Sequence, residues 1–457
     1  MELEKVTIVG AGLAGSEAAL QLANRGVEVE LHEMRPGKMT PAHHTGRFGE
    51  LVCSNSLKSL DPTSAAGTLK YELAVLGSRL IDIALDSSVP AGKALAVDRD
   101  VFSTRVTEEL KSNPNIKIVE GEVDAIPNGR AIVATGPLTS DGLADEIRRE
   151  LGSDFFAFYD AAAPVVEAES LDMDKLFSQS RYDKGGADYL NAPFDKEGYE
   201  AFVEELLNAE RVIPKAFESK DLFSACQPVE EIARSGKDAL RFGPLKPVGL
   251  TNPKTGHRPW AVVQLRAENE ALSAYNLVGF QTNLKHPEQE RVFRMIPGLE
   301  HAEFARFGVM HRNSFIDSPH VLGKTFEIPN RPVVRFAGQI TGTEGYCEAM
   351  ASGLLAALAT YCEIIGKELP PLPRDSMFGA LVDYATDPET QDYQPMHVNY
   401  GIARPFEKRI KNKRERYMSY ALRARKAIDE YRNRLSEIGV IAADPPIIRE
   451  QLKLPEF

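Results

Sequence analysis

The stretch Val6-Thr7-Ile8-Val9-Gly10-Ala11-Gly12-Leu13-Ala14-Gly15 decides the fold of this chain. Four apolar residues with a strand pattern lead into a glycine-rich turn, and an alanine-rich helical segment follows to about Arg25. A second strand pattern covers 27–32, and Gly26 lies where a glycine is expected after a helix C-terminus. This strand, turn, helix, strand unit predicts a Rossmann-like domain of the α/β class.

The glycine motif has the spacing of a dinucleotide site. Gly10 permits the tight turn, Gly12 lets the backbone approach a pyrophosphate, and Gly15 allows close packing of helix and strand. Glu33 lies 18 residues beyond Gly15, at the end of the second strand, where an acid can accept hydrogen bonds from a ribose. The alternative, a glycine-rich turn that binds nothing, does not explain this acid. Candidate cofactor-binding residues are therefore Gly10, Ala11, Gly12, Leu13, Ala14, Gly15 and Glu33.

The motif alone does not distinguish NAD from FAD, because both contain an adenosine diphosphate half. A distant second segment favours FAD: the strand 332–337 runs into Gly338, and glycines at 342 and 345 precede Tyr346. This segment could bring another helix N-terminus to the same elongated cofactor.

The order of patterns along the chain predicts an interrupted first domain. A helix over 100–112 leads to strands over 116–119 and 131–137, and residues 37–70 have the character of a long functional loop. From about residue 167 to 329 the alternation of strands and helices is lost, and it resumes with the strand at 332 and a helix over 348–361. We expect an FAD-binding domain over 1–166 and 330–404, an inserted α+β domain over 167–329 and a basic helical segment over 405–457.

The 457 residues have a formal net charge of −12, which by itself argues against nucleic acid as a partner. Residues 404–434 depart from this average, with twelve Lys and Arg against four acids. Phe406, Tyr417, Tyr420 and Tyr431 alternate with these cations, a combination suited to structured RNA. A solvated amphipathic helix with its aromatic side chains facing the core explains the pattern equally well.

The composition is typical of a soluble globular protein. No signal peptide precedes the first strand, and the apolar stretch 349–366 is too polar to span a bilayer, so we expect a cytoplasmic protein without a membrane partner. The four cysteines form no CxxC pair and no zinc-ligand pattern, and His43 and His44 have no companion ligands at useful spacing, so no metal site is predicted.

Two cysteines lie in polar segments where a reactive thiol and a buried structural thiol are both reasonable interpretations. Cys53 has His43, His44, Arg47 and Lys58 nearby in the sequence, and neighbouring cations increase the thiolate fraction. Cys226 stands beside a proline and two acids, and its pattern is no more suggestive. Cys347 and Cys362 fall in or beside an apolar helix, which favours packing for both.

The chain resembles the TrmFO (Gid) family of bacterial folate- and flavin-dependent tRNA uracil-5-methyltransferases. The resemblance rests on segments between residues 6 and 346, of which VCSNSL at 52–57 and GQITGTEGY at 338–346 are the most specific. HEMRP at 32–36, ATGP at 134–137 and ACQPVEEIAR at 225–234 also match. It implies a glutathione-reductase-like flavoprotein fold.

The resemblance also implies a reaction. In the family, FAD reduced by NAD(P)H accepts a methylene from 5,10-methylenetetrahydrofolate and passes it to carbon 5 of the T-loop uridine of tRNA, which gives 5-methyluridine. Uracil C5 becomes nucleophilic only after addition at C6, and a thiolate is suited to that addition. By motif, Cys226 matches the cysteine that attacks C6, and Cys53 matches the cysteine beside the flavin that handles the methylene intermediate or a proton. Gly338 and Tyr346 match the second cofactor segment.

Three other functions remain open on the sequence. They are the related flavoprotein family that modifies the wobble uridine of tRNA with a GTPase partner, an FAD-dependent oxidoreductase of a small molecule, and an RNA-binding flavoprotein without catalysis. The TrmFO resemblance itself implies the T-arm of tRNA as partner, with folate and nicotinamide co-substrates and no obligate protein partner.

Overall fold

A six-stranded sheet forms the centre of the first domain. The computed structural model describes residues 5–152, 156–183, 186, 188–212, 227–390 and 393–454. The strands of this sheet lie in the order β16-β17-β7-β1-β2-β6, and all neighbours are parallel except β16 and β17. Their bounds are β1 Val6–Val9, β2 Val29–Glu33, β6 Ile116–Glu120, β7 Ala131–Val133, β16 Glu327–Ile328 and β17 Arg331–Phe336. This is the predicted Rossmann-like α/β fold, with its topological switch point beside β1.

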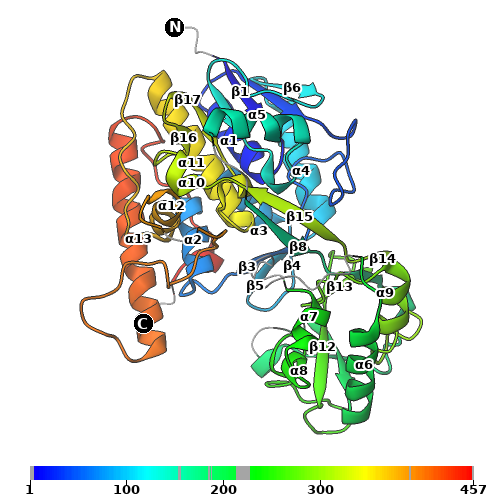
Figure 1. Cartoon of the computed structure of the whole chain (residues 1–457). Coiled ribbons are helices and arrows are strands. Elements are labelled where there is room, and N and C mark those ends of the chain that lie inside the picture. Colours follow the sequence, from blue (N-terminus) through cyan, green and yellow to red (C-terminus); the bar gives the residue numbers. More distant parts are fainter. Residues whose placement is uncertain are drawn as a thin grey trace.

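Two apolar helices pack together against this sheet (Figure 1). They are α1 (Leu13–Ala23), which follows the glycine turn, and α11 (Tyr346–Ile364), which follows the second glycine segment. A Cβ atom at Gly353 would lie 2.2 Å from the carbonyl oxygen of Ala14, so only glycine allows this approach. α11 is long and apolar enough to cross a membrane, but 83% of its apolar window is buried inside the protein, as in a core helix.

The second domain is built on an antiparallel sheet with its own core. Its strands lie in the order β10-β11-β12-β13-β9-β14. Their bounds are β9 Val165–Glu167, β10 Phe177–Ser178, β11 Tyr189–Phe194, β12 Ala261–Ala267, β13 Ala274–Leu277 and β14 Phe304–Arg306. The helices of this domain are α6 Lys196–Asn208, α7 Val229–Arg234, α8 Ala239–Phe242 and α9 His286–Phe293. Its core residues run from Ala163 to Ala302, and the predicted boundaries at 167 and 329 remain predictions.

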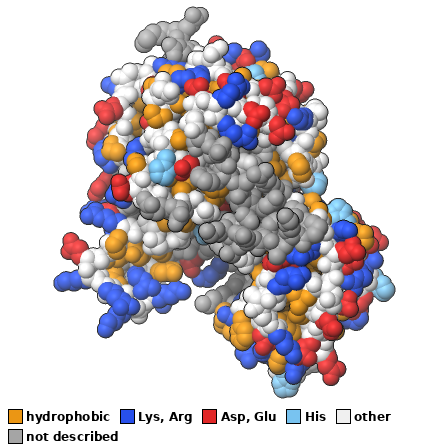
Figure 2. Space-filling model, viewed as in Figure 1, with side chains coloured by type: hydrophobic (Ala, Val, Ile, Leu, Met, Phe, Trp, Pro, Cys, Tyr) orange, Lys and Arg blue, Asp and Glu red, His pale blue; other side chains and the backbone are white. Residues whose placement is uncertain are grey.

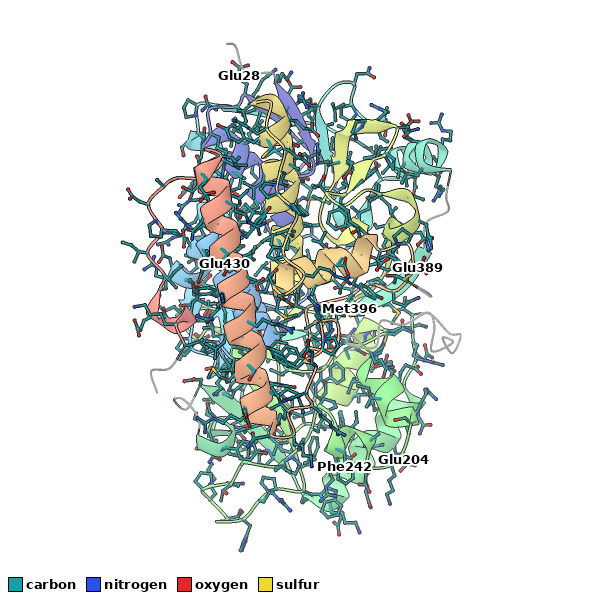
Figure 3. The ribbon with its side chains drawn as sticks, turned by 90° about the vertical axis from the view of Figure 1, so that its left-hand side faces the viewer. Glu28, Glu204, Phe242, Glu389, Met396 and Glu430 are labelled. Atoms are coloured by element: carbon teal, nitrogen blue, oxygen red, sulfur yellow. The ribbon has the colours of Figure 1, made fainter. Side chains whose placement is uncertain are left out.

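A two-stranded antiparallel ladder joins the two domains (Figure 1). It pairs β8 (Phe156–Ala161) with β15 (Met310–Phe315). The labelled residues of Figure 3 mark this division: Glu28 lies at the far end of the first domain, Phe242 and Glu204 lie on the second, and Met396 lies between them.

The remaining elements cover the first domain and correct two expectations. The predicted loop over 37–70 contains β3 (Ser56–Ser59) and the start of α2 (Ala65–Val75), because the Ser56–Ser59 backbone pairs with β5. The basic helical segment begins at Lys413, where the Asn412 side chain caps α13 (Lys413–Glu437), so 405–412 is not helical. The others are β4 Ser88–Val89, β5 Ala94–Val97, α3 Arg79–Asp86, α4 Arg99–Ser112, α5 Asp141–Leu151, α10 Ser318–Val321 and α12 Met377–Thr386.

Candidate active site

A cavity of about 460 Å³ lies at the carboxyl ends of the parallel strands. Val9, Glu33 and Ala134, at or just after the ends of β1, β2 and β7, line it together with Gly338, which follows β17. The cavity then continues to Cys53 and to the first residues of α11. Ligands of open α/β sheets bind at this edge, next to the switch point.

The glycine turn has the geometry of a pyrophosphate cradle. Gly10 has a φ of +98°, and a Cβ atom there would lie 2.6 Å from the Ala134 carbonyl oxygen. At Gly15 a Cβ atom would lie only 1.8 Å from the Gly10 oxygen, so the helix can start here only with glycine. Gly12 is different, because a Cβ atom there would meet no protein atom within 4 Å and would occupy space beside the cavity. The turn is therefore shaped for a group that approaches its backbone.

The Glu33 carboxylate already accepts hydrogen bonds from within the protein. Its Oε2 accepts the N–H of Ala11 at 2.8 Å, and its Oε1 accepts the backbone N–H and the Nε–H of Arg35 at 3.0 and 2.9 Å. Burial raises the pKa of Glu33, but the hydrogen bonds and charge of Arg35 outweigh it and hold that pKa below its ordinary value. Glu33 is thus a charged acceptor at the cavity wall, and it also fixes the turn at Ala11.

The second glycine segment supplies a further part of the cavity wall. Gly338 has a φ of +85°, and its N–H donates to Ser352 Oγ at 2.7 Å. Tyr346 begins α11 and lines the cavity with Gly338, and their predicted contact with the cofactor stays a prediction. The Leu13 and Ala14 positions at the start of α1 line the same cavity, so both helix N-termini point towards one ligand space.

Tyr346 connects α11 to the Cys53 loop. Its Oη accepts the N–H groups of Cys53 and Ser54 at 2.9 and 3.1 Å and donates to the Ser54 carbonyl at 3.0 Å. Asn55 fixes the other side of the loop, because its Nδ2 donates to the carbonyls of Val97 and Ala267. Cys53 is half-buried and lines the cavity, as a thiol that acts on a bound ligand must.

A charged cluster that the sequence did not indicate lies near Cys53. Arg99 donates a hydrogen bond to the carbonyl oxygen of Leu51. It also forms an ion pair with Glu268 of the second domain at 2.6 Å. Burial, and then repulsion from Arg99, lower the pKa of Arg306 to about 10. Nε and Nη2 of Arg306 are buried without a hydrogen-bond partner in the described ranges. No local pattern marks these residues, because they come from three distant segments.

Cys226 lies outside the described residues. The nearest described helix, α7, starts three residues later, where the Val229 N–H donates to the carbonyl of Gln281 at 2.7 Å. Gln281 lines the cavity.

Of the paired histidines, His43 is half-buried and contacts Thr40. His43 Nδ1 lies 2.6 Å from Thr40 Oγ1, and burial lowers the pKa of His43 to about 4. Over the ranges that the structure describes, no group of three or more His, Cys, Asp or Glu residues is placed to hold a metal ion.

The fold and the cavity define a class. One cavity is lined by the glycine turn, Glu33, a second helix N-terminus and a thiol. With the fold around it, this arrangement is that of a flavoprotein of the two-segment dinucleotide-binding type. The chain matches the family described as "Glucose inhibited division protein A" over residues 5–368.

The particular family follows from relatives of known name. The chain is 54% identical to methylenetetrahydrofolate–tRNA-(uracil-5-)-methyltransferase TrmFO of Pelotomaculum thermopropionicum, over 94% of this chain and 99% of the relative. It is 50% identical to the TrmFO of Bacillus subtilis, over 93% and 98%. This chain therefore belongs to the TrmFO family, a family of enzymes.

One solved structure supports the fold alone. Aquifex aeolicus GidA superposes with a TM-score of 0.67 at 17% identity, over 96% of this chain and 76% of that chain.

Proposed function

We propose that this chain methylates carbon 5 of the T-loop uridine of tRNA, with 5,10-methylenetetrahydrofolate as carbon donor, FAD as carrier and NAD(P)H as reductant. The observation that carries the proposal is that Cys53 lies on the wall of the same cavity as the dinucleotide cradle. The names of relatives at 50–54% identity support this reaction over wobble-uridine modification and over small-molecule oxidation.

The residues present fit FAD. The Gly12 backbone and the start of α1 would hold the pyrophosphate, Glu33 would accept from the ribose, and Gly338 with the start of α11 would face the flavin end. When bound, FAD supplies a redox centre that can carry two electrons and a one-carbon unit.

The chain itself supplies the thiols. Addition of the Cys226 thiolate to C6 of uracil gives C5 the electron density that it needs to bond to the methylene carbon. C5 then loses its proton, the sulfur leaves C6, and the methylene becomes methyl by gaining a hydride whose two electrons come from NAD(P)H. Cys53 acts at the flavin side, on the methylene or on a proton.

The start of α13 and the segment before it offer a surface for tRNA. Figure 2 shows Lys and Arg side chains gathered on the lobe at its lower left, where this segment lies in Figure 1. Exposed cations of the segment that form no ion pair within the described residues are Arg404, Lys408, Arg409, Lys411, Lys413 and Arg414. Six such cations can neutralise several phosphates.

The aromatic residues of this segment already pack against other residues of the protein. Tyr420 stacks on Tyr400 with ring centroids 4.7 Å apart, and Phe406 packs against Tyr420. Tyr431 is fully buried. Arg425 and Arg432 are buried too, and they bind the carbonyls of Leu452 and of residues 442–444. The second half of the basic segment is therefore a helix packed on the protein. The first half is the surface that we propose for RNA.

The substrate base must leave its stack to reach a cavity at the sheet edge. We propose that the T-loop uridine flips towards Cys53 and Cys226 at the cost of unstacking. A complex with that base still stacked in an intact tRNA elbow at the catalytic step would contradict this.

The enzyme is proposed to work in the cytoplasm without an obligate protein partner. The test is 5-methyluridine formation on an unmodified tRNA transcript with FAD, NAD(P)H and methylenetetrahydrofolate. Cys226→Ala and Cys53→Ala are expected to abolish the product, whereas Cys362→Ala, in the buried part of α11, should retain it. Retained product in the first two variants would overturn the roles of the thiols.

A further inference from the structure

Lys58 is held in an unusual backbone conformation on the cavity wall. Its φ is +65°, a region in which a residue with a side chain is strained by about 1 kcal/mol or more. Its Nζ lies 3.1 Å from Oε1 of Glu348, and both side chains line the cavity. Such strain persists only where the surroundings impose it, so the position of this ammonium group is specified.

Glu348 is the buried partner of Lys58, in the first turn of α11. Its side chain is 1% exposed. Oε1 also accepts the Val398 N–H at 3.1 Å, whereas Oε2 is buried without a hydrogen-bond partner. A Cβ atom on Gly345, the N-cap of α11, would lie 2.3 Å from Glu348 Oε2 and 2.8 Å from Lys58 Nζ. Both charges therefore lie against the N-terminus of a 19-residue helix.

This arrangement sets opposed charges at one helix N-terminus. A helix N-terminus carries about half a positive charge, so a cation beside it is unfavourable and is not needed to cap the helix. Burial and the Lys58 charge lower the pKa of His397, the third residue of this wall, so it adds no charge at neutral pH. Glu348, together with Glu344, which also lines the cavity, opposes the positive potential of Lys58 and of the helix N-terminus.

This wall is formed by the start of α11 and the Lys58 strand, whereas the cradle is formed by the turn before α1. With the adenosine half of FAD at the Gly10–Gly15 turn, as proposed, the flavin ring would face Cys53, Tyr346 and Lys58, which line the same cavity. Two-electron reduction by NAD(P)H delivers a hydride to flavin N5 and leaves one negative charge over N1 and the C2 carbonyl. A positive potential there stabilises the reduced form, and a carboxylate opposes it.

We infer that Lys58 and Glu348 form an opposed pair that sets the stability of the anionic reduced flavin, with Lys58 favouring it and Glu348 limiting the effect. The inference rests on the proposed binding of FAD. Removal of the Glu348 charge should therefore stabilise the reduced flavin.

Sulfite binding tests the pair without turnover. Sulfite forms a bond from its sulfur lone pair to flavin N5, with no leaving group, and it leaves the same negative charge at N1 and the C2 carbonyl. Titration of the FAD-loaded protein, followed by loss of flavin absorbance, is expected to give opposite shifts. Lys58→Met should weaken sulfite binding at least tenfold, and Glu348→Gln should tighten it several-fold.

The flavin reduction potential should fall in Lys58→Met and rise in Glu348→Gln. A tenfold change in a two-electron equilibrium corresponds to about 30 mV. Lys93→Met is the matched control, because Lys93 forms a comparable ion pair with Asp61 at 2.8 Å outside the cavity lining. It should leave sulfite binding unchanged.

A double variant covers the case in which Lys58→Met leaves Glu348 unpaired and does not fold. Lys58→Met with Glu348→Gln should bind sulfite at least tenfold more weakly than Glu348→Gln alone. Shifts of the two single variants in the same direction, or no shift beyond twofold in folded FAD-loaded variants, overturn the inference. Opposite shifts in a protein that makes no 5-methyluridine would support the pair and refute the proposed methylation, and a chain that binds no FAD refutes both.

Discussion

At the residue scale, one hydroxyl group fixes the backbone of the loop that contains Cys53. Tyr346 Oη takes two backbone N–H groups and gives its own proton to the Ser54 carbonyl, and burial raises the pKa of Tyr346 so that it stays protonated. Since Tyr346 is also the first residue of α11, the same side chain links the start of that helix to the position of Cys53.

Tyr346→Phe should lower the rate of 5-methyluridine formation by about tenfold or more, because a buried N–H group without a partner costs about 1–3 kcal/mol. FAD should remain bound. The comparison is with Tyr384→Phe, which removes a hydroxyl that donates to Gln394 away from the cavity and should leave the rate unchanged. Equal rates for the Tyr346→Phe variant and the unaltered protein would show that the loop is fixed by other contacts.

At the element scale, α1 and α11 must touch to direct their N-termini at one ligand. Gly353→Ala would place a methyl group 2.2 Å from the Ala14 oxygen. We expect a loss of about 1–3 kcal/mol in stability and weaker FAD binding, measured by thermal unfolding and by FAD titration of the apoprotein. Gly236→Ala has open space at its Cβ and should change neither, and a stable, fully FAD-binding Gly353→Ala variant would refute the close-packing argument.

The start of α13 carries the second prediction at this scale. Combined replacement of Lys408, Arg409, Lys411 and Lys413 by Ala should weaken tRNA binding and flatten its dependence on salt, because fewer counterions are released. Lys426 lies in the second half of α13, near Glu430, which is labelled in Figure 3. Lys426→Ala should have little effect on tRNA binding. An unchanged salt slope in the quadruple variant would place the tRNA elsewhere.

For the whole molecule, buried glutamates predict how stability depends on pH. Burial raises the pKa of Glu72 to about 8 and that of Glu230 to about 7, although both accept backbone N–H groups. Because the folded state holds these protons more tightly than the unfolded chain, their contribution is complete below about pH 4.5 and is lost progressively up to about pH 7 for Glu230 and about pH 8 for Glu72. His43, with its lowered pKa, acts oppositely but only below about 6.5.

The melting temperature should therefore fall as the pH rises from about 6.5, where the opposing effect of His43 ends, to about 8, and Glu72→Gln should flatten that fall. Differential scanning calorimetry at several pH values measures this directly. A flat profile in the unaltered protein would mean that Glu72 and Glu230 are ionised in the folded state at neutral pH.

The sequence predicted what local pattern determines. Gly10, Gly15 and Glu33 have fixed spacing around a strand and a helix, so the sheet edge and its cradle could be placed in advance. The Tyr346 contact to Cys53, the Lys58–Glu348 pair and Arg306 near Cys53 could not, because each joins segments more than 200 residues apart. No local pattern marks Glu348 at the start of an apolar helix, and the non-helical start of the basic segment depends on the Asn412 cap.

The most direct measurement of the central claim is nucleoside mass spectrometry of a tRNA transcript treated with this protein, FAD, NAD(P)H and tetrahydrofolate labelled in its methylene carbon. The account predicts labelled 5-methyluridine at the T-loop position. A yellow, FAD-loaded protein that leaves competent tRNA unlabelled would contradict it.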